Sequence, residues 1–302
     1  MNGCKDLQRF THMSRRWAEG ALVWNTFVWG TTFVVVKAAL ADVSPLLFLA
    51  LRFSVASLAL APLVVRRRTN WEWRTAGAGA LAGVFLFSGY LLQTFGLRLT
   101  SAPKSAFITG LSPVMVPLFA ALVYRSKPRV YEVAGLLVAT AGLVLMTVWG
   151  AAAAVNPGDL LTFLCAIAFA GHIVALGHFA GRMNFEVLSV MQVGTAAALS
   201  LASFWWAEPA HIRWRAATIG AILVTGLLAT ALAFTIQAWA QRRTTPTRTG
   251  LIYMLEPVFA WITSFVLAGE GLSRQAAAGA ILILGGVLMV ELKPLDSRRH
   301  PS

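Results

Sequence analysis

Charged residues are scarce in this chain, at 12% of its 302 residues, whereas apolar residues make up 58%. About a quarter of a soluble domain consists of Asp, Glu, Lys and Arg, so half that share cannot cover a surface that faces water. The mean hydropathy of +0.70 agrees with this deficit. The composition therefore excludes an ordinary soluble domain and favours a protein embedded in a lipid bilayer.

Acidic residues are the scarcer kind of charge, which leaves a net charge of +13. The basic residues form short clusters between apolar runs, such as Arg66-Arg67-Arg68 and Arg242-Arg243. A nucleic-acid-binding protein gathers its basic residues on one face, whereas clusters between apolar runs are typical of membrane loops. We therefore expect no nucleic-acid partner.

Cysteine is almost absent. Cys4 lies in the polar start of the chain and Cys165 inside an apolar run, so we expect no disulfide between them. The apolar run that follows the basic start lacks a convincing signal-peptidase site, and we interpret it as a retained first helix.

The sequence also lacks the motifs of several functional classes. It contains no HExxH, no GxSxG and no paired intramembrane aspartates, and His172 and His178 have no obvious metal partners. It has no GxxxxGK[ST] nucleotide motif and no filter-like loop or ring of charges typical of a channel. We therefore expect no enzyme, no cofactor and no metal site, and we expect any transport to be driven by gradients.

Long apolar runs are abundant. About 20 apolar residues in a helix cross the 30 Å hydrocarbon core, and short breakers such as Asn156-Pro157-Gly158 separate runs of this length. The sequence predicts an all-α polytopic membrane protein with ten transmembrane helices, near 20–40, 45–65, 75–97, 101–124, 130–149, 157–181, 185–207, 216–241, 245–269 and 274–292.

The loop charges predict the orientation. With a cytoplasmic N-terminus, the inner segments carry 18 of the 25 Lys and Arg residues and the outer loops carry 5, while Lys37 and Arg52 lie within spans. Cytoplasmic loops of membrane proteins are enriched in Lys and Arg. We therefore expect both termini to be cytoplasmic, in the cell's cytoplasmic (inner) membrane.

The two halves of the chain resemble each other at an offset of 144 residues. Residues 93–114 align with 237–258, so that Gln93 meets Gln237 and Pro113 meets Pro257. Because each half has an odd number of spans, the second must be inverted relative to the first. We expect two five-helix repeats, at 17–149 and 157–292, in an architecture typical of secondary transporters.

The chain resembles the EamA-like proteins of the drug/metabolite transporter superfamily. The resemblance rests on Trp29-Gly30-Thr31-Thr32-Phe33 with Lys37, on Gln93 through Pro113, and on residues 250–290 with Leu255-Glu256-Pro257-Val258. It implies a central cavity lined mainly by spans one, three, four, six, eight and nine. It also implies a transporter of amino acids, purines, drugs or other metabolites, often outward.

Polar and aromatic residues within spans are candidates for a solute site, because such groups usually face the bundle interior. They suit an amphipathic organic solute, although hydroxyls and amides can equally join helices. The candidates are Asn25, Trp29, Tyr90, Gln93, Ser105, Ser112, Phe169, His172, Gln237, Tyr253 and Glu256.

Glu256 is the strongest single candidate for a functional residue, because placing a carboxylate deep in a bilayer costs free energy. It can bind a cationic or hydroxylated group, take up a coupled proton, or serve as a structural acceptor. Pro113 and Pro257 are interpreted as paired hinges. Arg52 can bind an anion or cap carbonyls, Lys37 is expected to snorkel to the interface, and His172 can titrate or simply be hydrogen-bonded.

The sequence favours an alternating-access carrier of a small organic solute, with export as the expected direction. A flippase for lipids or lipid-linked sugars is the nearest alternative, and an intramembrane enzyme is more distant. A sugar-phosphate exchanger would need more basic groups in its cavity than Arg52 and Lys37. Glycines such as Gly279 and Gly286 suit close helix contacts, either within one chain or in a homodimer.

Overall fold

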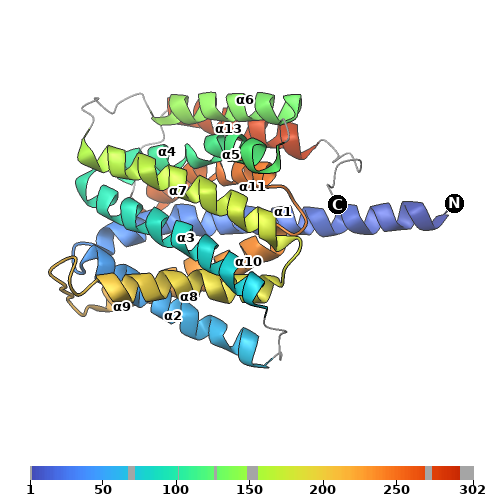
Figure 1. Cartoon of the computed structure of the whole chain (residues 1–302). Coiled ribbons are helices and arrows are strands. Elements are labelled where there is room, and N and C mark those ends of the chain that lie inside the picture. The colour runs from blue at the N-terminus through green and yellow to red at the C-terminus, as the bar shows by residue number, and fades with distance from the viewer. Residues whose placement is uncertain are drawn as a thin grey trace.

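The chain folds into a bundle of helices that lie roughly side by side (Figure 1). A computed structural model describes residues 2–66, 72–100, 102–125, 128–147, 156–268 and 274–292. Within these ranges there is no β-strand, and one isolated bridge joins Val43 to Ile212. Parts of the predictions, namely residues 101, 148–149 and 269 of the spans and Arg67-Arg68, lie outside the described residues.

The helices of the first half account for the first five predicted spans. They are α1 (Asn2–Ala39), α2 (Pro45–Arg66), α3 (Trp73–Leu99), α4 (Ala102–Thr109), α5 (Ser112–Tyr124) and α6 (Val130–Thr147). The fourth span is thus built from two helices, α4 and α5. In Figure 1, α1 extends beyond the rest of the bundle at its N-terminal end.

The helices of the second half account for the other five spans. They are α7 (Pro157–Ala180), α8 (Phe185–Ser203), α9 (Ala216–Gly226), the π-helix η1 (Leu227–Leu232), α10 (Ala233–Ala240), α11 (Pro246–Tyr253), α12 (Glu256–Ala268) and α13 (Arg274–Glu291). The eighth span runs through α9, η1 and α10, and the ninth is divided into α11 and α12.

Seven of the spans are long and apolar enough to cross a bilayer by themselves, and α6 and α13 are shorter apolar helices. In a bilayer every backbone polar group must find a partner within the protein, which a helix provides. The exterior carries exposed apolar side chains such as Leu118, Leu201 and Leu288, as a surface in contact with lipid requires. The prediction of an all-α polytopic membrane protein is confirmed.

The predicted breakers begin helices. Pro157 opens α7 behind Asn156, whose side chain accepts from the Asp159 amide while Asp159 accepts from the Asn156 amide. Pro246 begins α11 directly after Thr245, whose side-chain oxygen accepts from the Arg248 amide and so caps the helix. Proline suits this position because the first helical amide has no intrahelical partner to lose.

The two halves run in opposite directions. In Figure 1, α1 and α7 are antiparallel, and each is the first helix of its half. Contacts agree with this arrangement: Lys37, near the end of α1, donates to the carbonyl of Thr100 (3.1 Å), and Thr100 in turn donates to Asp159 at the start of α7 (2.8 Å). The end of α1 therefore lies at the same face of the bundle as the beginning of α7.

Helix contacts follow the same two-fold pattern. α6 packs on α13 and α2 on α8, while the contact of α1 with α12 is matched by that of α7 with α4 and α5. Glycines permit the closest approach. A Cβ atom at Gly142 would lie 2.5 Å from the Gly279 carbonyl oxygen. A Cβ atom at Gly135 would lie 2.7 Å from the Gly286 carbonyl oxygen. These glycines therefore join α6 to α13 within one chain.

Candidate functional site

Two spans are interrupted at corresponding positions in the middle of the bundle. The break between α4 and α5 falls at Gly110 and Leu111, and the break between α11 and α12 falls at Met254 and Leu255. The offset between the two breaks is 144 residues, the offset of the sequence repeat. Each break lies just before the proline that was interpreted as a hinge, and a proline amide cannot donate to the helix ladder.

A cavity of about 70 Å³ lies beside these breaks. On the order of five ordered waters would occupy such a volume. Spans one, two, three, four, six, eight and nine contribute to its wall, which consists of Trp29, Thr32, Phe33, Val36, Arg52, Tyr90, Gln93, Leu97, Thr109, Gly110, Ser112, Pro113, Phe169, His172, Ile173, Phe234, Gln237, Tyr253 and Glu256.

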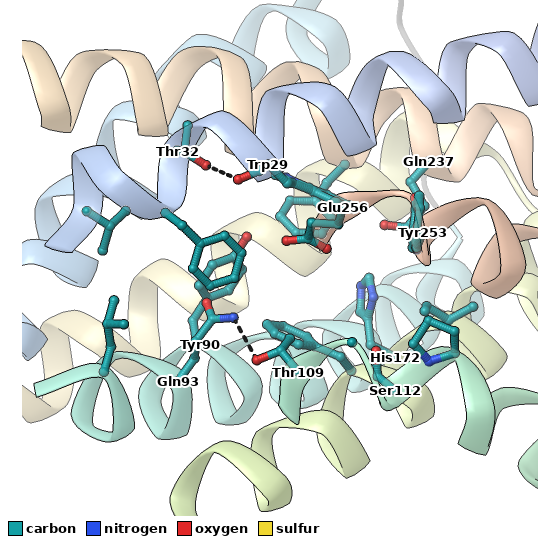
Figure 2. A pocket seen from close by; sticks show the side chains of 18 of the residues that line it. Trp29, Thr32, Tyr90, Gln93, Thr109, Ser112, His172, Gln237, Tyr253 and Glu256 are labelled. Carbon is teal, nitrogen blue, oxygen red and sulfur yellow. Dashed lines mark hydrogen bonds between the residues drawn. The ribbon is translucent and has the colours of Figure 1, made fainter. Parts of the chain in front are cut away.

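The wall is approximately symmetric. Trp29 and Thr32 of α1 correspond to Phe169 and His172 of α7 at an offset of 140 residues. At an offset of 144, Gln93 corresponds to Gln237, and Ser112 corresponds to Glu256. Figure 2 labels all of these side chains except Phe169 and shows that they gather around one space from both halves of the molecule.

Nine predicted solute-binding residues line the cavity, and two do not. The nine are Trp29, Tyr90, Gln93, Ser112, Phe169, His172, Gln237, Tyr253 and Glu256. Asn25 is buried and donates to the Ala233 carbonyl (2.7 Å), so it joins α1 to α10. Ser105 is buried away from the wall. Of the predicted hinge residues, Pro113 lies in the wall, whereas Pro257 lies just behind Glu256.

Aromatic rings form much of this wall. Trp29 lies edge-on to Tyr253 with 4.9 Å between ring centroids, and Tyr90 lies edge-on to Phe169 at 5.2 Å. Phe234 contacts Trp29, Tyr90 and His172. Such pairs contribute about 0.5–1.5 kcal/mol each beyond area burial, and they fix the rings around the cavity.

Arg52 anchors the side of the cavity next to the π-helix η1. Its Nε donates to Thr230 Oγ1 (2.7 Å) and its Nη2 donates to the Tyr90 hydroxyl (3.0 Å), while the guanidinium lies 4.3 Å from the Tyr90 ring centroid. No carboxylate of the described residues forms an ion pair with it within 4.0 Å. The sequence offered anion binding or carbonyl capping, and both remain compatible with this position.

The π-helix itself was not predicted. Its widened turn leaves the Ala229 carbonyl open to side chains, and it accepts from Trp29 Nε1 (2.8 Å) and from Arg52 Nη2 (3.4 Å). Such π-helical segments are rare in proteins, and those that occur are often found at functional sites. The local sequence of this segment, made of Leu, Ala and Thr, does not indicate a π-helix. The feature that sets the segment apart is its contact with Trp29 and Arg52 from other helices.

Glu256 is the first residue of α12, directly after the helix break. In Figure 2 its carboxyl group points into the cavity. The helix N-terminus favours negative charge there. No hydrogen bond or ion pair to its carboxyl group is found among the described residues, so this group is available to a solute, a water or a proton.

Two further polar side chains of the wall, His172 and Gln237, differ in whether their hydrogen-bonding groups have partners. His172 Nε2 lies 2.8 Å from Gln192 Oε1, which fixes the imidazole as a hydrogen-bonded interior group. Gln237 is 1% exposed, and its Oε1 has no hydrogen-bond partner in the described part of the chain. A buried acceptor left without a partner costs about 1–3 kcal/mol, so Gln237 is suited to receive a donor from a solute.

Lys37 corrects one expectation. Its ammonium group donates to the carbonyls of Leu97 and Thr100 at the end of α3, and so it caps a helix end rather than simply extending to the interface. This interaction fixes α1 against α3 on the side of the cavity that Val36 and Leu97 line.

The sequence profile of the EamA-like transporter family matches residues 16–148 and 156–292, so one copy falls on each half of the bundle. The chain belongs to the EamA-like transporter family. It is therefore a multi-pass membrane transporter, and the resemblance found in its sequence is confirmed.

Related proteins support this assignment over nearly the whole EamA-like chain. An uncharacterized transporter of Archaeoglobus fulgidus is 31% identical over 281 residues, covering 93% of this chain and 88% of that protein. YoaV of Bacillus subtilis, an uncharacterized transporter, is 22% identical and covers 87% and 93%. A probable terminal-alkyne amino-acid exporter of Streptantibioticus cattleyicolor is 27% identical and covers 93% and 96%.

A known crystal structure shows the same fold. It superposes with a TM-score of 0.75 at 23% sequence identity and covers 90% of this chain and 95% of its own. The relatives are named as transporters and not as enzymes, which agrees with the interpretation of a non-enzymatic carrier.

Proposed function

We propose that this EamA-like protein carries a small zwitterionic organic solute across the cytoplasmic membrane by alternating access, in the export direction. The observation that supports this most directly is the presence of one basic and one acidic side chain in the same cavity wall. Arg52 and Glu256 both face the same space, yet no ion pair within 4.0 Å joins them.

The charges favour a solute with both signs. A buried charge without a partner is costly, and a bound solute can supply the partner. The Arg52 guanidinium suits a carboxylate, because its planar fork matches the two oxygens. The Glu256 carboxylate suits an ammonium group. A solute with only one charge would leave the other side chain without its counterpart.

The remaining wall supports an organic solute with an apolar part. The rings of Trp29, Phe169 and Phe234 can cover an apolar side chain, while Gln93 and Gln237 can orient polar groups. The relative from Streptantibioticus cattleyicolor is named a probable amino-acid exporter, which supports both the solute class and the outward direction. The ionisable and amide groups among these rings favour a soluble metabolite over a lipid.

Alternating access is supported by the two inverted halves and by the broken spans at mid-bundle, a recurrent arrangement in secondary transporters. The bias of 18 to 5 in loop Lys and Arg residues supports cytoplasmic termini.

Counterflow into proteoliposomes tests the function. Purified protein is reconstituted, the vesicles are loaded with a panel of α-amino acids, and uptake of the same labelled compound is followed. We expect counterflow of at least one zwitterion, and less of its amide and its N-acetyl derivative, which each lack one charge. Equal counterflow of all three would contradict the zwitterion, and movement of a fluorescent phospholipid alone would support the flippase.

A further inference from the structure

Two buried polar clusters join the halves of the molecule. In the first, Glu19 Oε1 accepts from Thr244 Oγ1 (3.2 Å) and from Arg248 Nη1 (3.4 Å), and Arg15 Nε lies 3.3 Å away. This cluster connects α1 of the first half to α11, and to the turn before it, in the second half. We call Glu19, Thr244 and Arg248 the first latch.

The second cluster connects the halves in the reciprocal way. Thr100, directly after α3 of the first half, donates to Asp159 of α7 in the second half (2.8 Å). We call Thr100 and Asp159 the second latch. The second latch therefore uses an acid from the second half and a threonine from the first, whereas the first latch uses the opposite combination.

The two latches occupy equivalent places in the repeat. Thr100 corresponds to Thr244 at the offset of 144 residues, and Glu19 corresponds to Asp159 at the offset of 140 that also relates Trp29 to Phe169. Each acid lies ten residues before the aromatic residue of its own helix that lines the cavity. At 1.5 Å per residue this is about 15 Å along the helix axis.

The latches lie at opposite ends of the bundle. Glu19 lies near the beginning of the apolar span of α1 (Arg15–Ala39), and Asp159 lies near the beginning of α7. The helices α1 and α7 run in opposite directions (Figure 1). The cavity therefore lies between the two clusters, with one latch toward each membrane face.

Both latches are buried. The exposed fractions are 7% for Glu19 and 8% for Thr244 in the first latch, and 5% for Asp159 and 7% for Thr100 in the second. Hydrogen bonds that water does not reach are stronger than exposed ones. Because each latch joins helices between the cavity and one face, those helices cannot separate at that face while the latch is intact.

We propose that the first and second latches open in alternation, and that each one controls access to the cavity from its own face. With both formed around a small cavity, the structure corresponds to a closed intermediate. Relative movement of the helices that the latches join then breaks one latch while the other is kept. This inference rests on the proposed alternating access and names side chains that govern which face opens.

Sided thiol labelling tests the inference. The background lacks both native cysteines (Cys4→Ser, Cys165→Ala) and carries Thr32→Cys in the cavity wall. A membrane-impermeant maleimide is added to vesicles of either orientation, and the ratio of labelling rates from the two faces is measured. No solute is needed.

Thr244→Val removes the hydroxyl donor of the first latch, leaves the Arg248 donor in place and keeps the side-chain shape. It should raise labelling from the face where α1 enters the bundle by roughly three- to tenfold, the factor expected for loss of one hydrogen bond. Thr100→Val should raise labelling from the opposite face by a similar factor. The two variants are matched controls for each other.

The conservative variants Thr244→Ser and Thr100→Ser keep the hydroxyl and should restore the unmodified ratio. If a valine variant does not elute as a folded protein, Glu19→Gln and Asp159→Asn take its place with the same two directions expected. A shift of both variants toward the same face, no shift in either, or serine variants that behave like valine variants would overturn the latches. Opposed shifts without any counterflow would instead overturn the proposed function and leave the latches standing.

Discussion

At the scale of single residues, Glu256 and Arg52 divide the recognition of charge between them. Among the described residues that line the cavity, Glu256 is the one carboxyl group, and Arg52 is the one guanidinium or ammonium group. Their surroundings differ, because Arg52 is fixed by Thr230 and Tyr90 while the Glu256 carboxyl group has no partner among the described residues. We therefore expect their variants to fail in different ways.

Glu256→Gln keeps the shape of the side chain and removes its negative charge. We expect about a tenfold loss or more of zwitterion counterflow, because the solute's ammonium group loses its counter-charge. If Glu256 also carries a coupled proton, the variant should lose the response of transport to an imposed pH gradient. Counterflow and uptake across pH measure both effects, and transport by Glu256→Gln that equals the parent at every pH would remove Glu256 from the mechanism.

Arg52→Lys keeps the positive charge and loses the fork that reaches Thr230, Tyr90 and a solute carboxylate together. We expect transport to fall by about tenfold, since Lys cannot replace Arg where several donors are needed at fixed angles. Arg52→Gln should lose transport and should also reduce stability by about 1–3 kcal/mol, because Thr230 and Tyr90 lose a donor. Thermal unfolding in detergent separates the two effects, and a fully active Arg52→Gln protein would refute the role in binding.

At the scale of helices, the packing of α6 against α13 depends on glycine at specific positions. A Cβ atom at Gly286 would meet the Gly135 carbonyl oxygen and would lie 2.8 Å from the Ala139 amide nitrogen. The neighbouring Gly285 has open space around a Cβ atom. One helix therefore offers a sensitive position and an insensitive one in adjacent residues.

Gly286→Ala should lower the melting temperature because two backbones must separate, at a cost of about 1–3 kcal/mol. Gly285→Ala is the matched control and should leave the melting temperature unchanged or slightly raised, since alanine favours the helix. Thermal unfolding of the purified proteins followed by size-exclusion chromatography gives the comparison. Equal melting temperatures for the two variants would contradict the close contact.

The breaks in the fourth and ninth spans show what a sequence can indicate about an element. Pro113 and Pro257 are interpreted as hinges in their spans. The helices are interrupted just before them, at Gly110-Leu111 and Met254-Leu255. The length and hydropathy of the apolar runs, with their Pro and Asn breakers, were sufficient to predict the ten spans. The π-helix at Leu227–Leu232 could not be predicted, because it is stabilised by Trp29 and Arg52 from other helices.

The same reasoning explains the site predictions. Polar and aromatic residues in the matched spans are costly in lipid, so most of them do line the cavity. Asn25 was indistinguishable from them, although it bonds the Ala233 carbonyl. The cross-half contacts of Glu19 and Asp159 join residues whose partners lie far away in the chain, and no local pattern indicates such pairs.

At the scale of the whole molecule, the even number of spans places the beginning of α1 and the end of α13 at the same face (Figure 1). We expect reporters fused to the two termini to lie on one side, and the loop charges predict that this side is the cytoplasm. Protease protection in spheroplasts measures both. Reporters on opposite sides would contradict the inverted halves, and two external reporters would contradict only the proposed orientation.

The approximate symmetry of the cavity wall does not extend to its acidic group, because Ser112 of the first half corresponds to Glu256 of the second. Two equivalent acids would let a solute lie in either of two poses, related by the approximate two-fold rotation that relates the inverted halves. A lone acid removes that choice, so an occupant has a defined head and tail relative to the membrane normal. Enantiomers would then present different substituents to the aromatic rings, and this carrier should discriminate between the L and D forms of its cargo.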